Sequence, residues 1–277
     1  MERNYELLKS VLSVATHTYQ EELMINFIEN WLVENNLPYF VDDMGNIYVT
    51  KQTDQNIKFF PCVVSHTDTV HNIDTINIRE TILPNTQNIM KPSLNAFNNE
   101  GKPTGIGGDD KCGVYACLEL LKELPNLKAA FFVSEETGCY GSRSANKSFF
   151  ENVGYAIQFD APGNRMITEI SMGTRLFELN GDFHKITSNI LNEEFNGTGE
   201  YGSHPYTDIY ALKHLFDFSC INISIGYYRY HTRNEYVVIE DVYNGINVGK
   251  KIIEGLSYKK YKYLPDSNYL FNTKKQF

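Results

Sequence analysis

The chain lacks a surplus of basic residues, a cysteine-pair motif and any long apolar run, and each absence excludes a class of protein. Lys and Arg total 25 against 34 Asp and Glu, so the formal net charge is −9 and no basic surplus is present for a nucleic-acid partner. No apolar run approaches the roughly 18–20 residues that span a bilayer, and the segment MERNYELLKS has no apolar signal core. We therefore expect neither a nucleic-acid partner nor a membrane partner.

Cysteine is scarce as well, with five residues in 277 and no CxxC pair. An odd number of cysteines without a pairing motif is typical of reduced thiols and not of a disulfide framework. We therefore expect a cytoplasmic location for this protein. The five residues are Cys62, Cys112, Cys117, Cys139 and Cys220.

What the sequence does contain is a series of short apolar runs that alternate with segments of helical periodicity. With 42% hydrophobic residues, the chain can bury a sizeable core. Two short strands are expected within residues 39–50, and residues 71–104 are polar and irregular, with room for a hairpin. The pattern predicts an α/β fold with a mixed, mainly parallel central sheet and helices on both faces. Buried strands are predicted at 59–65, 127–134, 155–160 and 220–226, and helices at 2–16, 20–35, 107–124, 207–216 and 240–259.

The first of these buried strands runs into the stretch VVSHTDTVH, residues 63–71. Residues i and i+2 of a strand point to the same face, so His66 and Asp68 would be neighbours at its C-terminal end. In open α/β sheets, ligands bind outside the carboxyl ends of the strands. The pair therefore either belongs to a polar loop or begins an active site, and the choice depends on what the other strands bring to the same edge.

Acidic and imidazole side chains also follow the other predicted strands and precede the third helix. Carboxylates gathered so closely could not all stay ionised without a cation. Mixed His and carboxylate ligands suit zinc, with cobalt or manganese as substitutes. About five ligands exceed what one catalytic zinc needs, which favours two ions that share a carboxylate. The residues are Asp109 and Asp110 in the glycine-rich turn, Glu135 and Glu136 after the second strand, Asp160 at the end of the third, and His231 after the fourth.

Five motifs follow one another along residues 60–242, namely HTDTV, GIGGDDKCG, SEETGCYGS, a single aspartate after the next strand, and YHTRNE. In this order and spacing they resemble the co-catalytic zinc exopeptidases, and most closely the peptidase T and aminoacylase branch. The resemblance implies two zinc ions. His66 and Asp160 would hold one ion, Glu136 and His231 would hold the other, and Asp109 would bridge them. It also implies an exopeptidase acting on short peptides, with an N-acyl amino-acid deacylase as the alternative.

The same resemblance implies the catalytic residues. Glu135 would be the general base that takes a proton from a metal-bridging water as this water attacks the peptide carbonyl. Asp68 would orient His66, because a ligating imidazole usually donates its other N–H to a carboxylate. The family also has a cis peptide bond after the bridging aspartate, which here lies between Asp109 and Asp110.

One segment departs from the family's pattern. Relatives in this branch carry a domain-sized insertion between the last aspartate and the last histidine, whereas only residues 161–230 separate Asp160 from His231 here. We therefore expect residues 1–277 to form a single catalytic domain without a lid, with a loosely attached tail from about residue 263. The oligomeric state stays open. Without a lid, a substrate carboxylate would have to be bound by Arg175, Arg229 or Arg233.

Each candidate residue also has an ordinary structural explanation when it is taken alone. His66 and Asp68 could form a polar strand end, and Asp160 could cap its strand. Asp109 and Asp110 could cap the following helix. Glu135 and Glu136 could belong to a solvated turn, and His231 could be an ordinary loop histidine. A binding protein that kept the site without activity is a further alternative, although such a protein would not need Glu135. The remaining histidines are expected to be structural or unassigned: His17 and His214 as surface or packing residues, His184 in a connector, and His71 and His204 near the site without a defined role.

Overall fold

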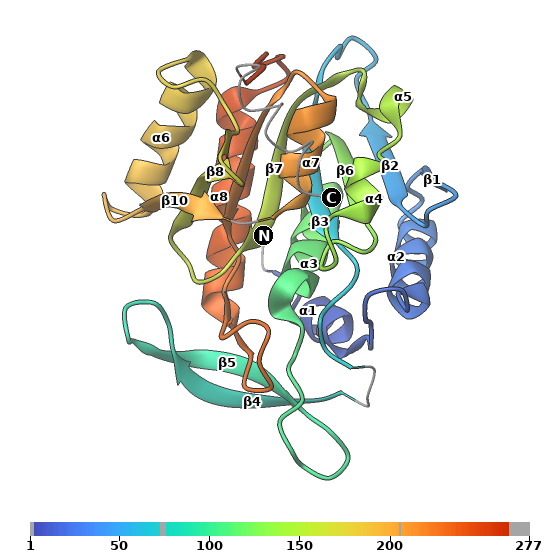
Figure 1. Cartoon of the computed structure of the whole chain (residues 1–277), viewed down its shortest axis with the longest axis vertical. Helices are drawn as coiled ribbons and strands as arrows, with labels where there is room; N and C mark the ends of the chain where they lie inside the picture. Colours follow the sequence, from blue (N-terminus) through green and yellow to red (C-terminus); the bar gives the residue numbers. More distant parts are fainter. Residues whose placement is uncertain (1–2, 73–75, 205, 266–277) are drawn as a thin grey trace.

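The described residues form a central sheet of nine strands (Figure 1). This computed structural model describes residues 3–72, 76–204 and 206–265. Strands β6, β3, β7 and β11 run parallel in the middle of the sheet, whereas β1, β2 and β8 join through antiparallel pairs. The predicted α/β class, with a mixed sheet that is parallel in its core, is confirmed. The strand order is β1(Tyr39–Val41), β2(Ile47–Gln52), β6(Asn126–Phe132), β3(Phe60–His66), β7(Val153–Ala161), β11(Ser219–Ser224), β8(Met166–Ser171) and β10(Glu200–His204), with β9(Thr174–Arg175) paired to β8.

The central strands are buried along their whole length. Every residue is buried in β3 (FPCVVSH), in β6 (NLKAAFF) and in β7. Parallel strands that are covered on both faces have no solvent side, so they carry continuous apolar runs without alternation. For this reason the predicted ranges 59–65 and 127–134 differ from β3 and β6 by at most two residues at either end.

Helices cover both faces of this sheet (Figure 1). On one face, α3(Gly108–Glu123) packs on β3, β6 and β7, with α1(Tyr5–Ser13) and α8(Ile239–Leu256) beside it and α6(Asp182–Glu194) against α8. On the other face, α7(Asp208–Leu215) packs on β3, β7 and β11 together with α4(Tyr140–Arg143). Helices α2(Glu22–Glu34) and α5(Lys147–Phe150) lie toward the β1 and β2 end. Each Leu, Ile, Val or Phe side chain buried between these layers contributes about 1.5–3 kcal/mol to stability.

A second, four-stranded antiparallel sheet lies at one end of the molecule (Figure 1). It pairs β12(Tyr227–Tyr228), β13(Tyr236–Val238), β5(Met90–Phe97) and β4(Asn77–Pro84) in this order. The β4–β5 hairpin confirms the hairpin expected within residues 71–104. The sheet packs closely against the start of α3, because a Cβ added to Gly108 would come within 2.7 Å of the Cβ of Tyr227.

Three parts of the fold differ from the prediction. Residues 182–194 form α6, so His184 lies on a helix and not in the connector predicted for it. The sequence pattern also misses β10, because the segment EYGSH lies at the sheet edge with four of its five residues exposed and therefore lacks an apolar run. The first helix is shorter than predicted and ends at Ser13.

Two further expectations concern the ends of the chain and the membrane. The tail predicted from about residue 263 falls mostly on residues 266–277, which lie outside the described residues. Within the described part, the carbonyl of Tyr263 accepts a hydrogen bond from the buried ammonium group of Lys213. None of the described helices is both long enough and apolar enough to span a bilayer.

Candidate functional site

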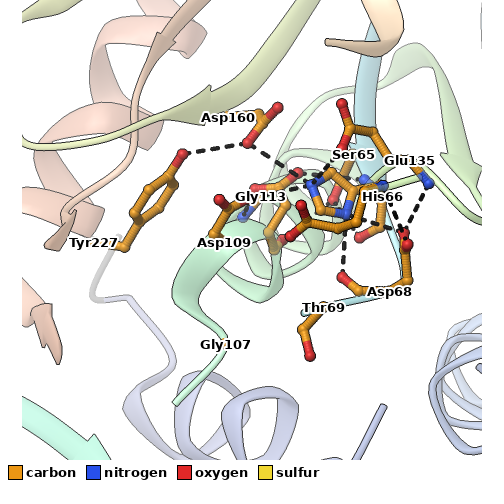
Figure 2. Close-up of polar contacts among 12 residues, drawn as sticks. Ser65, His66, Asp68, Thr69, Gly107, Asp109, Gly113, Glu135, Asp160 and Tyr227 are labelled. Atoms are coloured by element: carbon orange, nitrogen blue, oxygen red, sulfur yellow. Dashed lines mark hydrogen bonds and ion pairs between the residues drawn. The ribbon is translucent and has the colours of Figure 1, made fainter. Parts of the chain in front are cut away.

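The C-terminal ends of the central strands bring the predicted side chains to one place (Figure 2). The contributing segments are β3, β7, the first turn of α3, the loop after β6, and the connection between β12 and β13. The structure brings all of the predicted site residues into this cluster or, for Asp68, into direct contact with it. In the order of these segments, they are His66, Asp160, Asp109, Glu135 with Glu136, and His231.

Asp109 lies between the two imidazoles. Its Oδ1 is 3.2 Å from Nε2 of His66, and its Oδ2 is 3.2 Å from Nε2 of His231. Each imidazole also has a second carboxylate: Oδ1 of Asp160 lies 3.8 Å from His66, and Oε2 of Glu136 lies 3.1 Å from His231. The cluster therefore has two halves, each with one imidazole and one carboxylate, and the Asp109 carboxylate faces both.

Three residues hold Asp160, two through its carboxylate and one through its backbone. The Tyr227 hydroxyl donates to its Oδ1 at 3.3 Å, and the Gln158 amide donates to its Oδ2 at 3.1 Å (Figure 2 shows the first of these contacts). The side chain of Asn222, on the neighbouring strand β11, bonds to both the N–H and the carbonyl of Asp160. These contacts fix the carboxylate in the buried interior of the sheet, where its position depends little on solvent.

Asp68 is fully buried and contacts both His66 and the loop after β6. Its Oδ1 lies 3.3 Å from Nδ1 of His66, on the side of the ring opposite to Asp109. The same carboxylate accepts the backbone N–H of Glu135 at 3.0 Å, the N–H of Glu136 at 3.2 Å and the hydroxyl of Thr18 at 2.8 Å. A ligating imidazole is commonly oriented by a carboxylate in this way.

The loop that carries the two glutamates is fixed by side chains from distant segments. The N–H of Val133 donates to Asn46 at 3.1 Å, and the N–H of Ser134 donates to the buried Glu21 at 3.0 Å. Together with the two bonds to Asp68, four successive backbone N–H groups are satisfied by side-chain oxygens. Glu135 itself is buried, and its Oε2 lies 3.9 Å from Nε2 of His66.

The cluster has many negative groups and few cationic partners. Burial and the nearby Asp160 raise the pKa of Glu135 well above its usual range, and burial and the nearby Asp109 do the same for the pKa of Asp160. Hydrogen bonds to Asp109 and Glu136 raise the pKa of His231 to about 10. Throughout the part of the chain that the structure describes, these carboxylates form ion pairs with histidine and with no Lys or Arg. The donor set therefore fits divalent cations, which would offset the carboxylates and bind neutral imidazoles.

Asp110 is close to the same cluster but serves the backbone. It can be grouped with His66 and Asp160, since potential ligand atoms of the three lie within 4.8 Å of one another. However, its Oδ1 accepts the N–H of Gly113 at 3.0 Å, and its Oδ2 accepts the N–H of His66 at 3.3 Å. Asp110 thus caps α3, whereas Asp109 points both of its oxygens at imidazoles. The bond between these two aspartates is cis, as the resemblance implies.

Glu235 is a site residue that the sequence interpretation overlooked. It is buried and accepts the N–H of Gly107 at 2.8 Å and the N–H of Asp109 at 3.1 Å. The ring of His71, which had no defined role, bonds to the same carboxylate at 2.6 Å. Glu235 therefore holds the turn that positions Asp109. Its signal was present in the sequence, because it is the last residue of the YHTRNE motif.

A cleft of about 200 Å³ opens onto the cluster. Besides the acidic residues and His231, it is lined by His204, Tyr206 and Tyr230, so His204 does lie at the site. None of Arg175, Arg229 and Arg233 lines this cleft. A larger hollow of about 490 Å³ lies beside Glu21 and Tyr140, but it contains none of the paired imidazoles and carboxylates. The smaller cleft is therefore the better candidate for chemistry.

No protein-family model and no curated protein sequence matches this chain. Solved structures do match it. With an aminopeptidase PepT from Bacillus cereus the TM-score is 0.74 and the identity 14%, over 92% of this chain and 99% of that chain. With a tripeptidase from Staphylococcus aureus the TM-score is 0.66 and the identity 12%, over 90% of this chain and 96% of that chain. With a TET aminopeptidase from a marine-sediment Thaumarchaeota archaeon they are 0.64 and 11%, over 91% and 96%.

At such low identity these likenesses establish the fold. The predicted resemblance to an exopeptidase catalytic domain is confirmed at this level, and the sheet with helices on both faces is the architecture shared with these aminopeptidases. The role of each site residue, the number of metal ions and the arrangement as a single domain without a lid stay predictions.

Proposed function

We propose that the protein is a metal-dependent peptidase that cleaves residues from the end of short peptides. The observation that carries this proposal is the position of Asp109, whose two oxygens each lie 3.2 Å from a different imidazole. A carboxylate shared between two ions is a recurrent feature of hydrolytic centres. The fold, which is that of solved aminopeptidases and of a tripeptidase, supports the same class of reaction.

Two zinc ions fit the donors in this site. His66 and Asp160 would hold one ion, His231 and Glu136 would hold the other, and Asp109 would bridge them, with cobalt or manganese as substitutes. When bound, the ions would lower the pKa of a water molecule and polarise the peptide carbonyl.

The orientation of His66 follows from its two neighbours. The backbone carbonyl of Asp68 lies 3.1 Å from Nδ1 of the ring and its carboxylate 3.3 Å, so both stabilise a proton on Nδ1 and Nε2 is left as the ligand atom. Asp68 also fixes the backbone positions of Glu135 and Glu136, because it accepts both of their N–H groups. One buried carboxylate thereby aligns an imidazole and the two glutamates that face it.

Glu135 is the proposed general base. It lines the cleft, whereas its neighbour Glu136 already pairs with His231, so the two glutamates can divide proton transfer and metal binding between them. The Glu135 carboxylate would accept a proton from the attacking water and then deliver it to the amine that leaves. Among the hydrogen bonds of the described residues, the Glu135 carboxylate has one partner, the thiol of Cys139, which is a weak donor at 3.4 Å.

Short peptides are the proposed substrates. A cleft of about 200 Å³ admits the end of a peptide but not a folded chain. The matching solved structures are named aminopeptidase and tripeptidase, which supports an exopeptidase over a deacylase. All five cysteines are free and buried, in keeping with the proposed cytoplasmic location.

The test is elemental analysis of the purified protein together with hydrolysis of free and N-acylated di- and tripeptides, with and without a chelator. We expect about two metal ions per chain and cleavage of peptides with a free amino terminus that the chelator abolishes. Cleavage of the N-acylated substrates alone would instead indicate a deacylase. A protein that binds metal but cleaves nothing after zinc or cobalt is added would be a binding protein, and the proposal would be wrong.

A further inference from the structure

A second groove, of about 350 Å³, adjoins the cleft. The two hollows share Tyr230, which lines both. Two arginines, Arg165 and Arg229, line this second groove. Arg165 lies directly before β8, and Arg229 directly follows β12, so the two guanidinium groups reach one groove from different sheets.

Neither guanidinium group has an acidic partner among the described residues. Their contacts are instead with neutral groups. The amide of Gln87, turned so that its oxygen faces Arg165, accepts from Nε and from Nη2 at 2.8 Å, and Arg229 lies over the ring of Tyr236 at 5.9 Å. Glu200 also lines the groove, and among the ion pairs of the described residues it has none with either arginine. The charged groups of the groove are thus two cations against one anion.

The remaining arginines suggested by the sequence are placed differently. Arg175 pairs with Glu169 at 3.8 Å and lines neither the cleft nor the adjoining groove. Arg233 is exposed and lines neither of them. Of Arg175, Arg229 and Arg233, only Arg229 lines the groove that adjoins the cleft. The tertiary structure brings a further arginine, Arg165, to the same groove.

The backbone ties Arg229 to the proposed metal centre. Arg229 and His231 both adopt the left-handed conformation, with φ of 53° and 58°, which is uncommon for residues other than glycine. The hydroxyl of Thr232 donates to the carbonyl of Arg229 at 2.6 Å and closes the turn. A strained turn that persists in a native fold often serves a site. Here one turn presents an imidazole to the cleft and a guanidinium group to the groove beside it.

We propose that Arg165 and Arg229 bind a carboxylate of the substrate, so that the preferred substrates are short peptides with a free carboxylate beyond the scissile bond. A guanidinium group suits a carboxylate because it offers a planar, permanently charged set of donors. The inference rests on the proposed function and specifies its substrate class. The carboxylate belongs either to the peptide's C-terminus or to an acidic side chain, and the two sources share this chemistry.

The experiment uses the full, zinc-loaded chain and four peptides: Leu-Gly-Gly, its C-terminal amide, Leu-Gly-Glu amide and Leu-Gly-Gln amide. We expect kcat/KM to be at least about tenfold higher for Leu-Gly-Gly than for its amide, as one charge-assisted hydrogen bond would give. The Glu and Gln amides distinguish the source, because a side-chain carboxylate would favour Leu-Gly-Glu amide by a similar factor. In Arg165→Gln and in Arg229→Gln, the ratio of kcat/KM for the free acid to kcat/KM for the amide should fall toward one.

Arg233→Gln is the matched control. Arg233 lies two residues after His231, as Arg229 lies two residues before it, and it contacts Gly105 only through its backbone carbonyl. This variant should keep the wild-type preference. A preference that Arg165→Gln and Arg229→Gln both leave unchanged, or a wild-type enzyme without preference for either carboxylate, would overturn the inference while peptide cleavage itself stands.

Calorimetric binding of the same four peptides to the metal-free protein and its variants separates the two proposals. If no peptide is cleaved, the proposed function fails, but tighter binding of the free acids that is lost in Arg229→Gln would still support the carboxylate groove. Equal binding of acids and amides would reject the groove whatever the activity.

Discussion

The carboxylate of Asp68 accepts the backbone N–H of Glu135 at 3.0 Å, so the residue that faces one imidazole also fixes the loop of the proposed base. Asp68 directly follows β3 and Glu135 lies in the loop after β6, and these two strands are parallel neighbours in the sheet. One buried side chain therefore couples the orientation of the His66 ring to the position of the Glu135 backbone.

Replacement of Asp68 with Asn should lower both metal affinity and kcat/KM by about 10–100-fold, the usual cost of removing a group that orients a metal ligand. The N–H groups of Glu135 and Glu136 donate to different oxygens of Asp68, so the amide nitrogen of Asn would face one of them without accepting its hydrogen bond. The measurement is zinc affinity by competition with a chromophoric chelator, together with steady-state kinetics. Asp43→Asn, at an exposed position, is the control, and wild-type affinity in Asp68→Asn would contradict the proposed role.

Replacement of Glu135 with Gln should lower kcat by about 10²–10⁴-fold, the range that general-base catalysis contributes. Metal content should stay at about two ions per chain, because Glu135 is not one of the proposed ligands. Single-turnover kinetics and elemental analysis measure the two effects. If the variant loses metal, the roles of Glu135 and Glu136 must be exchanged.

Replacement of His66 with Ala should reduce the zinc content, because this imidazole faces Asp109 and Asp160 together. Elemental analysis after dialysis is the measurement. His184→Ala on α6 is the matched control, since this histidine belongs to a helix remote from the central strand ends. Unchanged zinc content in His66→Ala would count decisively against the site.

Replacement of Glu235 with Gln should destabilise the protein by about 1–3 kcal/mol, the cost of leaving buried hydrogen-bonding groups without partners. Its carboxylate accepts from two backbone N–H groups and bonds to the ring of His71, and one amide cannot replace all three bonds. Denaturant unfolding of the metal-free protein measures the effect, with the exposed Glu193→Gln as the control. Equal unfolding midpoints for the two variants would show that Glu235 does not hold the turn.

The stability of the metal-free protein should depend on pH through Asp208. Burial raises the pKa of this carboxyl to about 6, above its ordinary value of 3.8. Between these values the folded state binds more protons than the unfolded state, so this residue's contribution to stability falls as pH rises through 6. Asp208→Asn should therefore stabilise the protein by about 1–3 kcal/mol at pH 7.5 and by much less at pH 4. An equal effect at the two pH values would exclude titration of Asp208 as the cause.

Much of the site could be predicted from the sequence because of local rules. Strands that are buried on both faces must be apolar throughout, so β3 and β6 were located closely, and the polar residue that ends each such run lies at the edge where ligands bind. The pair His66 and Asp68 follows from the two-residue period of a strand. Motif order then placed the remaining candidates at the same edge.

Other features depend on pairings between distant segments, which no local period encodes. The exposed β10 carries no apolar signal and depends on its pairing with β8. The helix α6 is a different case, because Phe183, Ile186, Ile190 and Leu191 do lie at helical spacing and the sequence interpretation passed over them. Glu235 acquires its role when β13 pairs with β5 and brings its carboxylate to the turn before α3. Arg165 and Arg229 come to one groove in the same way, from two different sheets.

The sequence by itself determined the fold class, the order of the core strands along the chain and the residue types at their ends, because burial and backbone periodicity act on neighbours in the chain. Only the tertiary structure decided that Asp109 faces both imidazoles, and that two arginines without an ion pair among the described residues line the groove beside the cleft. The two contacts of Asp109 join it to residues 43 and 122 positions away along the chain, and such distances arise only when the sheets assemble.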